Sequence, residues 1–242
     1  MKVSVVIPVY NEQSTVEEVI RRVAAVPLRI EREIIVADDG SCDGTGAILK
    51  RLEAEGAIRV STSPVNRGKG AAVRSALACA SGDVILIQDA DLELAPEEYP
   101  VLLRPLLDGQ ADVVYGSRFA GRLAGIRLIT RLANKALVRL TNLLYGSRLT
   151  DMETAYKVFR TSLVRRIRLD ANGFEFEPEV TAKLLRLGCR IAEVPISYRP
   201  RTATEGKKIG WKDGVTAVAC LLKYRWAPVR TFMRDEGAGR LQ

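Results

Sequence analysis

One stretch of the chain passes directly from apolar to acidic residues: Asp83-Val84-Ile85-Leu86-Ile87-Gln88-Asp89-Ala90-Asp91-Leu92-Glu93. The apolar run at 84–87 includes β-branched residues, which is typical of a strand buried on both faces of a parallel sheet. Open α/β sheets bind ligands beyond the carboxyl ends of such strands. The sequence therefore predicts a central strand with a binding site directly after it.

The acids that follow this strand are two residues apart. Residues at this spacing point to the same side of an extended segment, so Asp89, Asp91 and Glu93 would direct their carboxylates to one point. Such carboxylates repel each other unless a cation lies between them, and hard cations such as Mg²⁺ or Mn²⁺ take oxygen ligands. An isolated Asp-x-Asp is more often a solvated acidic turn, so the choice depends on the rest of the chain.

Composition narrows the class of protein. The chain has 242 residues, of which 47% are hydrophobic and 27% charged, as in a well-packed globular protein. It has no histidine, which excludes Ser-His-Asp and Cys-His catalysis. Its four cysteines lack paired spacing, which fits a reducing cytoplasm, and no segment reaches the ~18 apolar residues of a membrane span. A net charge of +8 indicates an anionic partner: a phosphate ligand, a membrane surface or a nucleic acid.

Strands and helices alternate through the first half. The sequence predicts strands at 2–8, 33–37, 58–62, 84–87 and 111–115, with a helix after each of the first four. The first helix begins near Thr15, where we read Ser14-Thr15-Val16-Glu17 as a capping box. Such alternation predicts an α/β fold with a mainly parallel sheet. No linker is evident, so residues 1–234 are predicted as one domain and residues 235–242 as a flexible tail.

Polar residues end two further strands, at Tyr10-Asn11-Glu12 and at Asp38-Asp39. Because parallel strands share their carboxyl edge, these residues and Asp89-Ala90-Asp91 are expected to form one cleft. There is no G-x-G-x-x-G after the first strand, which argues against a nicotinamide-binding site. Gly68-Lys69-Gly70 only loosely resembles a phosphate-binding loop.

The second half is more basic. No acidic residue occurs between Arg118 and Arg148, and basic residues recur about every fourth position, which favours a helix with a basic stripe over much of this span. That stripe suits an anionic membrane surface or a lipid phosphate, with an ordinary solvated face as the alternative. Further strands are predicted at 156–159 and 190–198, and helices at 178–187 and 211–226.

Taken in order, several motifs resemble the family 2 glycosyltransferases of the glycosyltransferase-A fold. They are Val6-Ile7-Pro8-Val9-Tyr10-Asn11-Glu12, Asp38-Asp39-Gly40-Ser41, Asn66-Arg67-Gly68-Lys69-Gly70 and Asp89-Ala90-Asp91. Within this family the chain is similar to dolichol-phosphate mannose synthases and bacterial polyprenyl-phosphate sugar transferases. That closer match rests on Gly116-Ser117-Arg118, Glu193-Val194-Pro195-Ile196 and Glu205-Gly206-Lys207-Lys208.

The resemblance implies a nucleotide-sugar donor, a divalent cation and inversion at the anomeric carbon. It implies that residues 1–116 bind the donor and residues 117–234 the acceptor. It also implies roles for individual residues. Pro8, Tyr10, Glu12 and Asp39 would hold the nucleoside, Lys69 and Ala90 the rest of the donor, Asp89, Asp91 and Glu93 the metal, and Arg118, Arg201 and Lys207 phosphates. Many relatives carry Gln at the position of Glu93.

A lipid phosphate is the expected acceptor, because a phosphate monoester is largely ionised at pH 7 and needs no base to attack the sugar. Asp91 and Arg118 are the expected catalytic residues, and Arg118, Arg131 and Lys135 are expected to bind the acceptor. We therefore predict a cytoplasmic enzyme, peripheral to the membrane, that moves mannose or glucose from a nucleotide diphosphate sugar to a polyprenyl phosphate using Mg²⁺ or Mn²⁺.

Two alternatives remain open from the sequence. A glycosyltransferase acting on a hydroxyl would need a carboxylate base, for which Asp151 and Glu153 are candidates. A nonenzymatic nucleic-acid-binding module would account for the charge, but the basic residues are not interleaved with aromatic ones and acids crowd the strand ends. We therefore expect no nucleic-acid partner.

Overall fold

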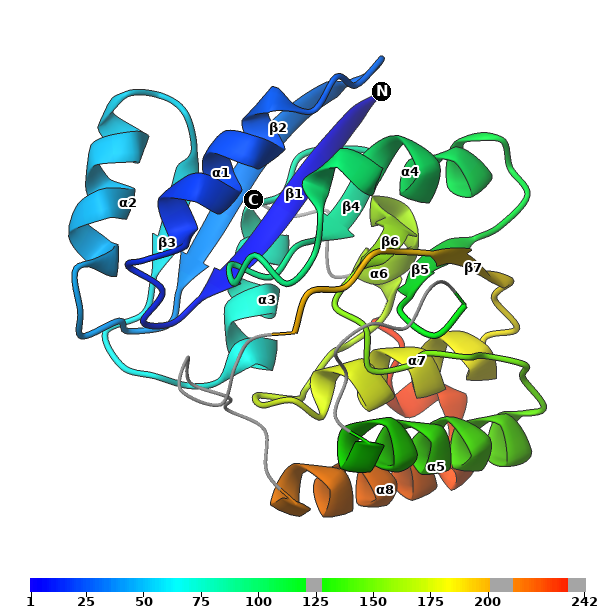
Figure 1. Cartoon of the computed structure of the whole chain (residues 1–242). Helices are drawn as coiled ribbons and strands as arrows, with labels where there is room; N and C mark the ends of the chain where they lie inside the picture. Colours follow the sequence, from blue (N-terminus) through cyan, green and yellow to red (C-terminus); the bar gives the residue numbers. More distant parts are fainter. Residues whose placement is uncertain (121–127, 201–210, 235–242) are drawn as a thin grey trace.

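The computed structural model describes residues 1–120, 128–200 and 211–234. Its centre is a seven-stranded sheet with the order β3-β2-β1-β4-β6-β5-β7 (Figure 1). β6 pairs antiparallel with both of its neighbours, and every other pair of neighbouring strands is parallel. The strands are β1 (Lys2–Val9), β2 (Glu31–Asp38), β3 (Arg59–Thr62), β4 (Val84–Ile87), β5 (Val113–Ser117), β6 (Lys157–Arg160) and β7 (Ile191–Pro195).

Helices cover both faces of this sheet. One face packs against α1 (Val16–Ala25), α2 (Thr45–Ala54) and α4 (Tyr99–Leu107), which follows the short 3-10 turn η1 (Pro96–Glu98). The other face packs against α3 (Lys69–Cys79), α6 (Thr161–Arg166) and α7 (Phe176–Arg186). All four residues of β4 are buried, as expected for a strand covered on both sides.

Two further helices form a layer outside α7. α5 (Leu128–Tyr145) and α8 (Trp211–Trp226) lie side by side below α7 in Figure 1 and share a small core with it and with η3 (Val229–Thr231). The Tyr145 hydroxyl donates to the carbonyl of Leu221 over 2.6 Å and joins the two helices. Within the described ranges, no helix combines the length and the apolar character needed to cross a bilayer.

The structure confirms the predicted single α/β domain with a mainly parallel sheet. Three expectations are corrected. The predicted capping box is not formed, since Thr15 is the N-cap of α1 and no side chain caps it. The basic helix occupies 128–145, and residues 118–120 are not helical. The predicted fifth strand lies at 113–117 rather than 111–115. The predicted flexible tail at 235–242 lies outside the described residues.

The amino end of the central strands carries a partly buried carboxylate, Glu33, with a consequence for acid stability. Burial alone would raise the pKa of Glu33, but hydrogen bonds from Ser4, Lys2 and Ser81 outweigh burial and lower the pKa to about 2. Because the unfolded chain titrates this group near 4.5, the folded state holds fewer protons between these values. Its contribution to stability is therefore present above pH 4.5 and lost as the pH falls toward 2.

We expect Glu33→Gln to lower the free energy of unfolding at pH 7 by about 1.5–3 kcal/mol, the contribution of hydrogen bonds to a charged group. The decline of stability between pH 4.5 and pH 2 should also become shallower. Thermal unfolding across this range measures both effects, with Glu31→Gln on the exposed start of the same strand as the control. Identical pH profiles for Glu33→Gln and wild type would contradict the assignment.

Candidate active site

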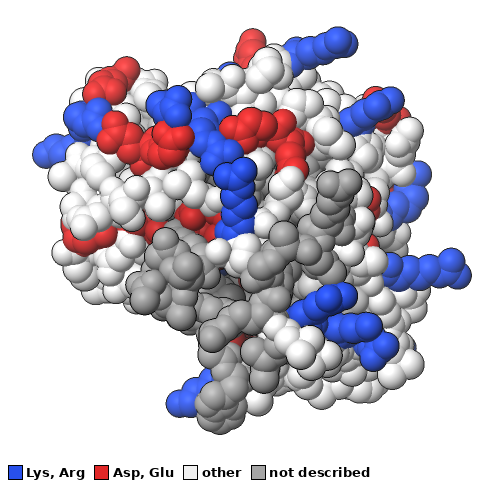
Figure 2. Space-filling view, viewed as in Figure 1, with Lys and Arg blue, Asp and Glu red and all other residues white. Residues whose placement is uncertain are grey.

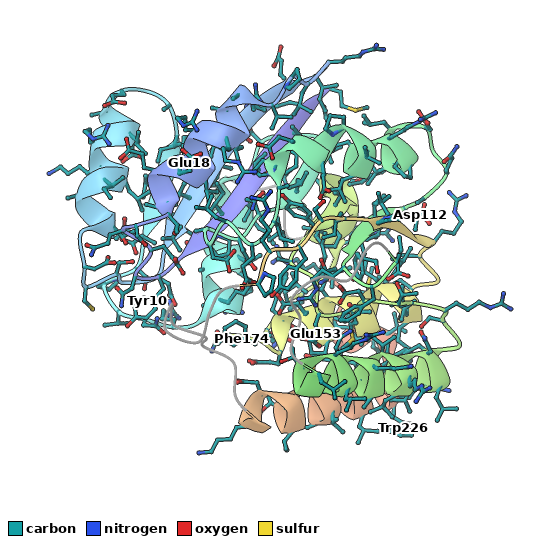
Figure 3. The ribbon with its side chains drawn as sticks, viewed as in Figure 1. Tyr10, Glu18, Asp112, Glu153, Phe174 and Trp226 are labelled. Atoms are coloured by element: carbon teal, nitrogen blue, oxygen red, sulfur yellow. The ribbon has the colours of Figure 1, made fainter. Side chains whose placement is uncertain are left out.

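The carboxyl ends of six strands meet at one edge of the sheet. Since β6 runs the opposite way, its amino end lies at this edge too, and residues 150–156 arrive there with it. The amino end of α7 also reaches this edge. Figure 3 shows Tyr10, Phe174 and Glu153 along it, from three separate segments. The predicted site is thus assembled from residues of both halves of the chain.

The acidic turn after β4 rests on a rigid support. The buried amide of Gln88 accepts hydrogen bonds from the Tyr99 and Tyr156 hydroxyls, each 2.8 Å long. Beyond it, Leu92 adopts a left-handed backbone with φ of 59°, which side-chain-bearing residues seldom do. This bend gives Asp91 a local contact, because the Glu93 amide donates to the Asp91 carboxylate over 3.2 Å.

The three predicted metal ligands are not gathered around one point. In the described part of the chain no cluster of three acidic side chains could hold a metal ion. Asp89 lies 2.9 Å from the Lys69 ammonium, and Glu93 accepts a hydrogen bond from the Tyr198 hydroxyl over 2.9 Å. Asp89 and Asp91 still offer oxygen ligands of the kind that Mg²⁺ and Mn²⁺ prefer. The metal role of all three acids stays a prediction.

The residues predicted to hold the nucleoside line the strand ends of the first half. Asp39 is buried, and its carboxylate accepts the backbone amides of Arg67 and Gly68, the latter over 2.6 Å. Asp38 caps its own turn by accepting the Ser41 amide. Glu12 and Ala90 are buried, and Pro8 and Tyr10 are half-buried. Asp39 therefore fixes the loop that leads into α3, and its predicted contact with the nucleoside remains untested.

Lys69 begins α3 and is enclosed by acids. Its ammonium lies 2.9 Å from Asp89 and 2.9 Å from Glu177, in the first turn of α7. Burial alone would lower the pKa of Lys69, but these two carboxylates outweigh burial and hold the pKa well above its ordinary value. Lys69 is thus a charged residue within the site rather than the solvated start of a helix.

Arg118 follows β5 and is held by Asp151. Its Nε and Nη2 atoms donate to the two carboxylate oxygens of Asp151 over 2.7 and 2.9 Å. Asp151 is fully buried, and the guanidinium lies 5.3 Å from the centre of the Tyr198 ring. Glu193 on β7 fixes the same loop by accepting the backbone amides of Thr150 and Asp151. Arg118 thus reaches the site already paired.

The sequence did not predict that three charged side chains, those of Glu153, Lys157 and Glu177, lie together in the site. Glu177 and Lys157 were not assigned a role, and Glu153 was considered only as a base for a hydroxyl acceptor. Burial and the nearby Glu177 raise the pKa of Glu153 to about 7. Burial lowers the pKa of Lys157 to about 8, and its ammonium donates to the carbonyl of Met152. Glu177 directly precedes the predicted helix at 178–187, which was the available signal, but only the tertiary structure brings it to Lys69.

The remaining predicted residues lie elsewhere. Arg131 and Lys135 are exposed on α5, in the layer outside α7. Arg201 and Lys207 fall outside the described residues, as does most of the basic loop that contains them. The contact of these four residues with phosphates or acceptor stays a prediction.

The sequence of residues 4–168 matches the model of the family described as glycosyl transferase family 2. This match covers more than half of the chain. The chain belongs to glycosyl transferase family 2. Relatives and solved structures of the family add two kinds of information, on the acceptors that members use and on the ligands that they bind.

Curated members of the family extend the match beyond residue 168. An undecaprenyl-phosphate mannosyltransferase from Micrococcus luteus is 32% identical over 239 residues, covering 93% of this chain and 94% of the relative. A dolichol-phosphate mannosyltransferase from Pyrococcus furiosus is 29% identical and covers 87% of this chain. The chain spans 60% of that second relative and 34% of a Haloferax volcanii glycosyltransferase, AglD.

Solved structures similar to this chain confirm the predicted glycosyltransferase-A fold. Glucosyl-3-phosphoglycerate synthase from Mycobacterium tuberculosis, in complex with Mn²⁺, uridine diphosphate and glucosyl-3-phosphoglycerate, is 28% identical with a TM-score of 0.72. The similarity covers 94% of this chain and 81% of that one. The same enzyme has been solved with Mg²⁺ and uridine diphosphate.

Proposed function

We propose that this chain is an inverting, metal-dependent glycosyltransferase that moves a hexose from a nucleotide diphosphate sugar to a polyprenyl phosphate. One observation carries the proposal. The acidic turn after β4 and Arg118 after β5 lie at the same edge of the sheet, separated only by β6. An acid pair suited to a cation and a guanidinium suited to a phosphate are therefore neighbours in one family 2 site.

The donor would lie along the first half of this edge. Asp89 and Asp91 would hold a Mg²⁺ or Mn²⁺ ion, whose charge stabilises the leaving diphosphate. Lys69 would stand beside them as a second positive charge, since its ammonium already contacts Asp89. The Asp39 carboxylate accepts hydrogen bonds from the backbone amides of Arg67 and Gly68, and would thereby hold the 66–69 loop rigid against the nucleoside. Rigid placement lowers the barrier because the reacting groups need no reorganisation.

The acceptor would approach from the second half. A lipid phosphate needs no base, because its second pKa is near ~6 and it is mostly ionised at pH 7. Arg118 would orient the phosphate oxygen that attacks the anomeric carbon, with Tyr198 and Phe119 as aromatic walls around the guanidinium. The mannosyltransferase that matches nearly the full chain has undecaprenyl phosphate in its name, which supports this acceptor class.

A small phosphorylated hydroxyl is the second candidate acceptor. The similar solved structures are of glucosyl-3-phosphoglycerate synthase, whose named product joins glucose to a phosphorylated acid. A hydroxyl acceptor needs a base with a pKa near neutrality, and the pKa of Glu153 is raised to about 7. Glu153 would take that role under this alternative.

One incubation separates the two candidates. The protein is given GDP-mannose, GDP-glucose, UDP-glucose or UDP-mannose with Mn²⁺, beside either undecaprenyl phosphate in vesicles or 3-phosphoglycerate. Mass spectrometry of the lipid and aqueous fractions identifies the product. Glycosylated lipid alone supports the proposal, glycosylated phosphoglycerate alone supports the second candidate, and no product with any donor contradicts both.

We further propose that α5 and α8 place the enzyme on the cytoplasmic face of the membrane. Six of the nine exposed large hydrophobic side chains in the described residues belong to these two helices: Leu128, Leu132, Leu143, Val215, Leu222 and Trp226. The leucines of α5 are therefore divided, because Leu137, Leu140 and Leu144 pack against the core while Leu128, Leu132 and Leu143 face outward. Figure 3 shows Trp226 at the far end of α8, away from the sheet.

The same face carries positive charge. Arg131, Lys135 and Arg139 are exposed on α5, which has no acidic residue. Figure 2 shows Lys and Arg side chains over the region that α5 occupies in Figure 1. Exposed leucines and a tryptophan flanked by basic residues suit an anionic bilayer, where the apolar groups enter the interface and the cations meet lipid phosphates.

We expect Arg131→Ala with Lys135→Ala and Arg139→Ala to lower binding to anionic vesicles by tens-fold, since each cation near such a surface contributes about 1 kcal/mol. Donor binding should change less than about two-fold. Co-sedimentation with anionic and neutral vesicles measures the first effect and calorimetry the second.

The control carries the same charge change on other elements: Arg29→Ala, Lys50→Ala and Arg104→Ala, all at exposed positions. This variant should sediment like wild type. If the α5 variant also sediments like wild type, the basic stripe is an ordinary solvated face and the docking proposal is wrong.

A further inference from the structure

The Lys69 ammonium joins the two halves of the site. It lies 2.9 Å from Asp89, in the acidic turn after β4, and 2.9 Å from Glu177, in the first turn of α7. The exposed fraction of the side chain falls from 27% for Asp89 through 15% for Lys69 to 4% for Glu177. The three charges thus form a row that leads from the partly exposed Asp89 into the protein.

Glu177 has binding capacity that its surroundings do not use. Its Oε2 atom is buried and has no hydrogen-bond partner within the described part of the chain. Leaving a buried carboxylate oxygen without a partner costs about 1–3 kcal/mol or more, so Glu177 lies beside Lys69 at an energetic cost.

The backbone of Lys69 cannot move far. The amides of Gly70 and Ala71 donate to the carbonyls of Gly173 and Asn172 over 3.3 and 3.1 Å. A Cβ atom at Gly68 would lie 2.4 Å from the Asn172 carbonyl oxygen, so the two backbones touch at a residue that has to be glycine. Any change of partner by Lys69 must therefore come from rotation of its own side chain.

An ammonium on Asp89 competes with any metal ion for the same carboxylate. If Lys69 had Asp89 as its only partner, a metal ion would have to displace a buried ion pair completely, which is costly. Glu177 removes that requirement, because the Lys69 ammonium keeps its ion pair with Glu177 when Asp89 turns toward the metal ion. The lysine then remains charged, compensated and within reach of a bound diphosphate.

We propose that Glu177 is a positioning residue that holds Lys69 as a movable counter-charge for Asp89. Before the cation binds, Lys69 neutralises Asp89; once the cation binds, Lys69 stays on Glu177 and faces the diphosphate. This role rests on the metal-dependent function proposed above. Glu177 itself touches neither donor nor acceptor.

Mn²⁺ binding without donor or acceptor tests the proposal, with free Mn²⁺ followed by electron paramagnetic resonance. Glu177→Gln should weaken Mn²⁺ binding by about 5–10-fold, because Lys69 then has Asp89 as its only anionic partner. Lys69→Met should strengthen Mn²⁺ binding several-fold, because the competing ammonium is gone. Glu175→Gln is the matched control, since its carboxylate accepts amides of Asn172 and Gly173 and does not contact Lys69. It should change Mn²⁺ affinity less than two-fold.

The double variant distinguishes a role through Lys69 from a simple effect of charge. In the Lys69→Met background, Glu177→Gln should lose most of its effect on Mn²⁺ affinity. An equal effect in both backgrounds, or unchanged affinity in Glu177→Gln, would overturn the proposal while leaving the metal-dependent function intact. Absence of Mn²⁺ binding by the wild type would overturn both. Should Glu177→Gln fail to fold, Lys69→Met decides alone, and unchanged Mn²⁺ affinity there would also overturn the proposal.

Discussion

Asp91→Asn is expected to reduce turnover by at least ~100-fold, the scale of losing one main electrostatic stabiliser of a transition state. The substitution keeps the shape of the side chain and its oxygen acceptor for the Glu93 amide, so the bend at Leu92 should persist. What is lost is one negative charge at the proposed metal and diphosphate site. The fold should be unaffected, since Asp91 is only half-buried.

Single-turnover kinetics across a Mn²⁺ titration measures this loss. Asp83→Asn is the matched control, because Asp83 lies just before β4, at the opposite edge of the sheet, and is exposed. That variant should retain wild-type turnover. Chelation of divalent ions should abolish the wild-type reaction. Activity of Asp91→Asn within about three-fold of wild type, unaffected by chelator, would remove Asp91 from the metal site.

Arg118→Ala is expected to affect both stability and turnover. Without the guanidinium, the fully buried Asp151 carboxylate loses its charged partner. It keeps the hydrogen bond from the backbone amide of residue 118. Breaking a buried pair by removing one partner costs about 3–5 kcal/mol. For a chain of this size the melting temperature should fall by on the order of 10 °C. Turnover should fall as well, because the acceptor phosphate loses its proposed partner, while binding of the folded protein to vesicles should be kept.

The double variant Arg118→Ala with Asp151→Asn separates these two effects. It removes both charges, so more than half of the lost stability should return while turnover stays low. Calorimetric unfolding and turnover on a short water-soluble prenyl phosphate are measured side by side. Recovery of turnover together with stability would mean that Arg118 serves only the fold.

Most strands of the first half could be predicted because they are compact apolar runs. The exceptions are β3, which has one apolar residue among four, and β5, which begins two residues later than predicted. The run at 84–87 is buried on both faces, and the acids after it lie at the carboxyl edge, as its sequence implied. Asp39 was placed at the same edge by the alternation of strands and helices, and Lys69 was assigned to the donor site by the family resemblance. Local patterns sufficed here because parallel strands joined by helices share one edge by geometry.

The partners of these residues could not be predicted, because they come from distant parts of the chain. Asp151 lies 33 residues from Arg118, and Glu177 reaches Lys69 from another helix. The Arg118 pairing depends on β6 running against its neighbours, which brings residues 150–156 to the functional edge. The Lys69 pairing depends on the packing of the start of α3 against the loop that precedes α7. No local pattern in Lys157–Arg160 specifies whether this strand runs parallel or antiparallel to its neighbours, because a short strand can be buried in the sheet in either direction.

Local sequence patterns were enough to predict the fold class, the sheet edge that carries the site and the family to which the chain belongs. These depend on apolar periodicity and on short motifs, which act within a few residues. The tertiary structure alone decided which charges meet: Lys69 with both Asp89 and Glu177, and Arg118 with Asp151. It also decided that α5 exposes three of its leucines to solvent. The physical reason is that pairing and exposure depend on packing between elements, whereas each element forms from its own residues.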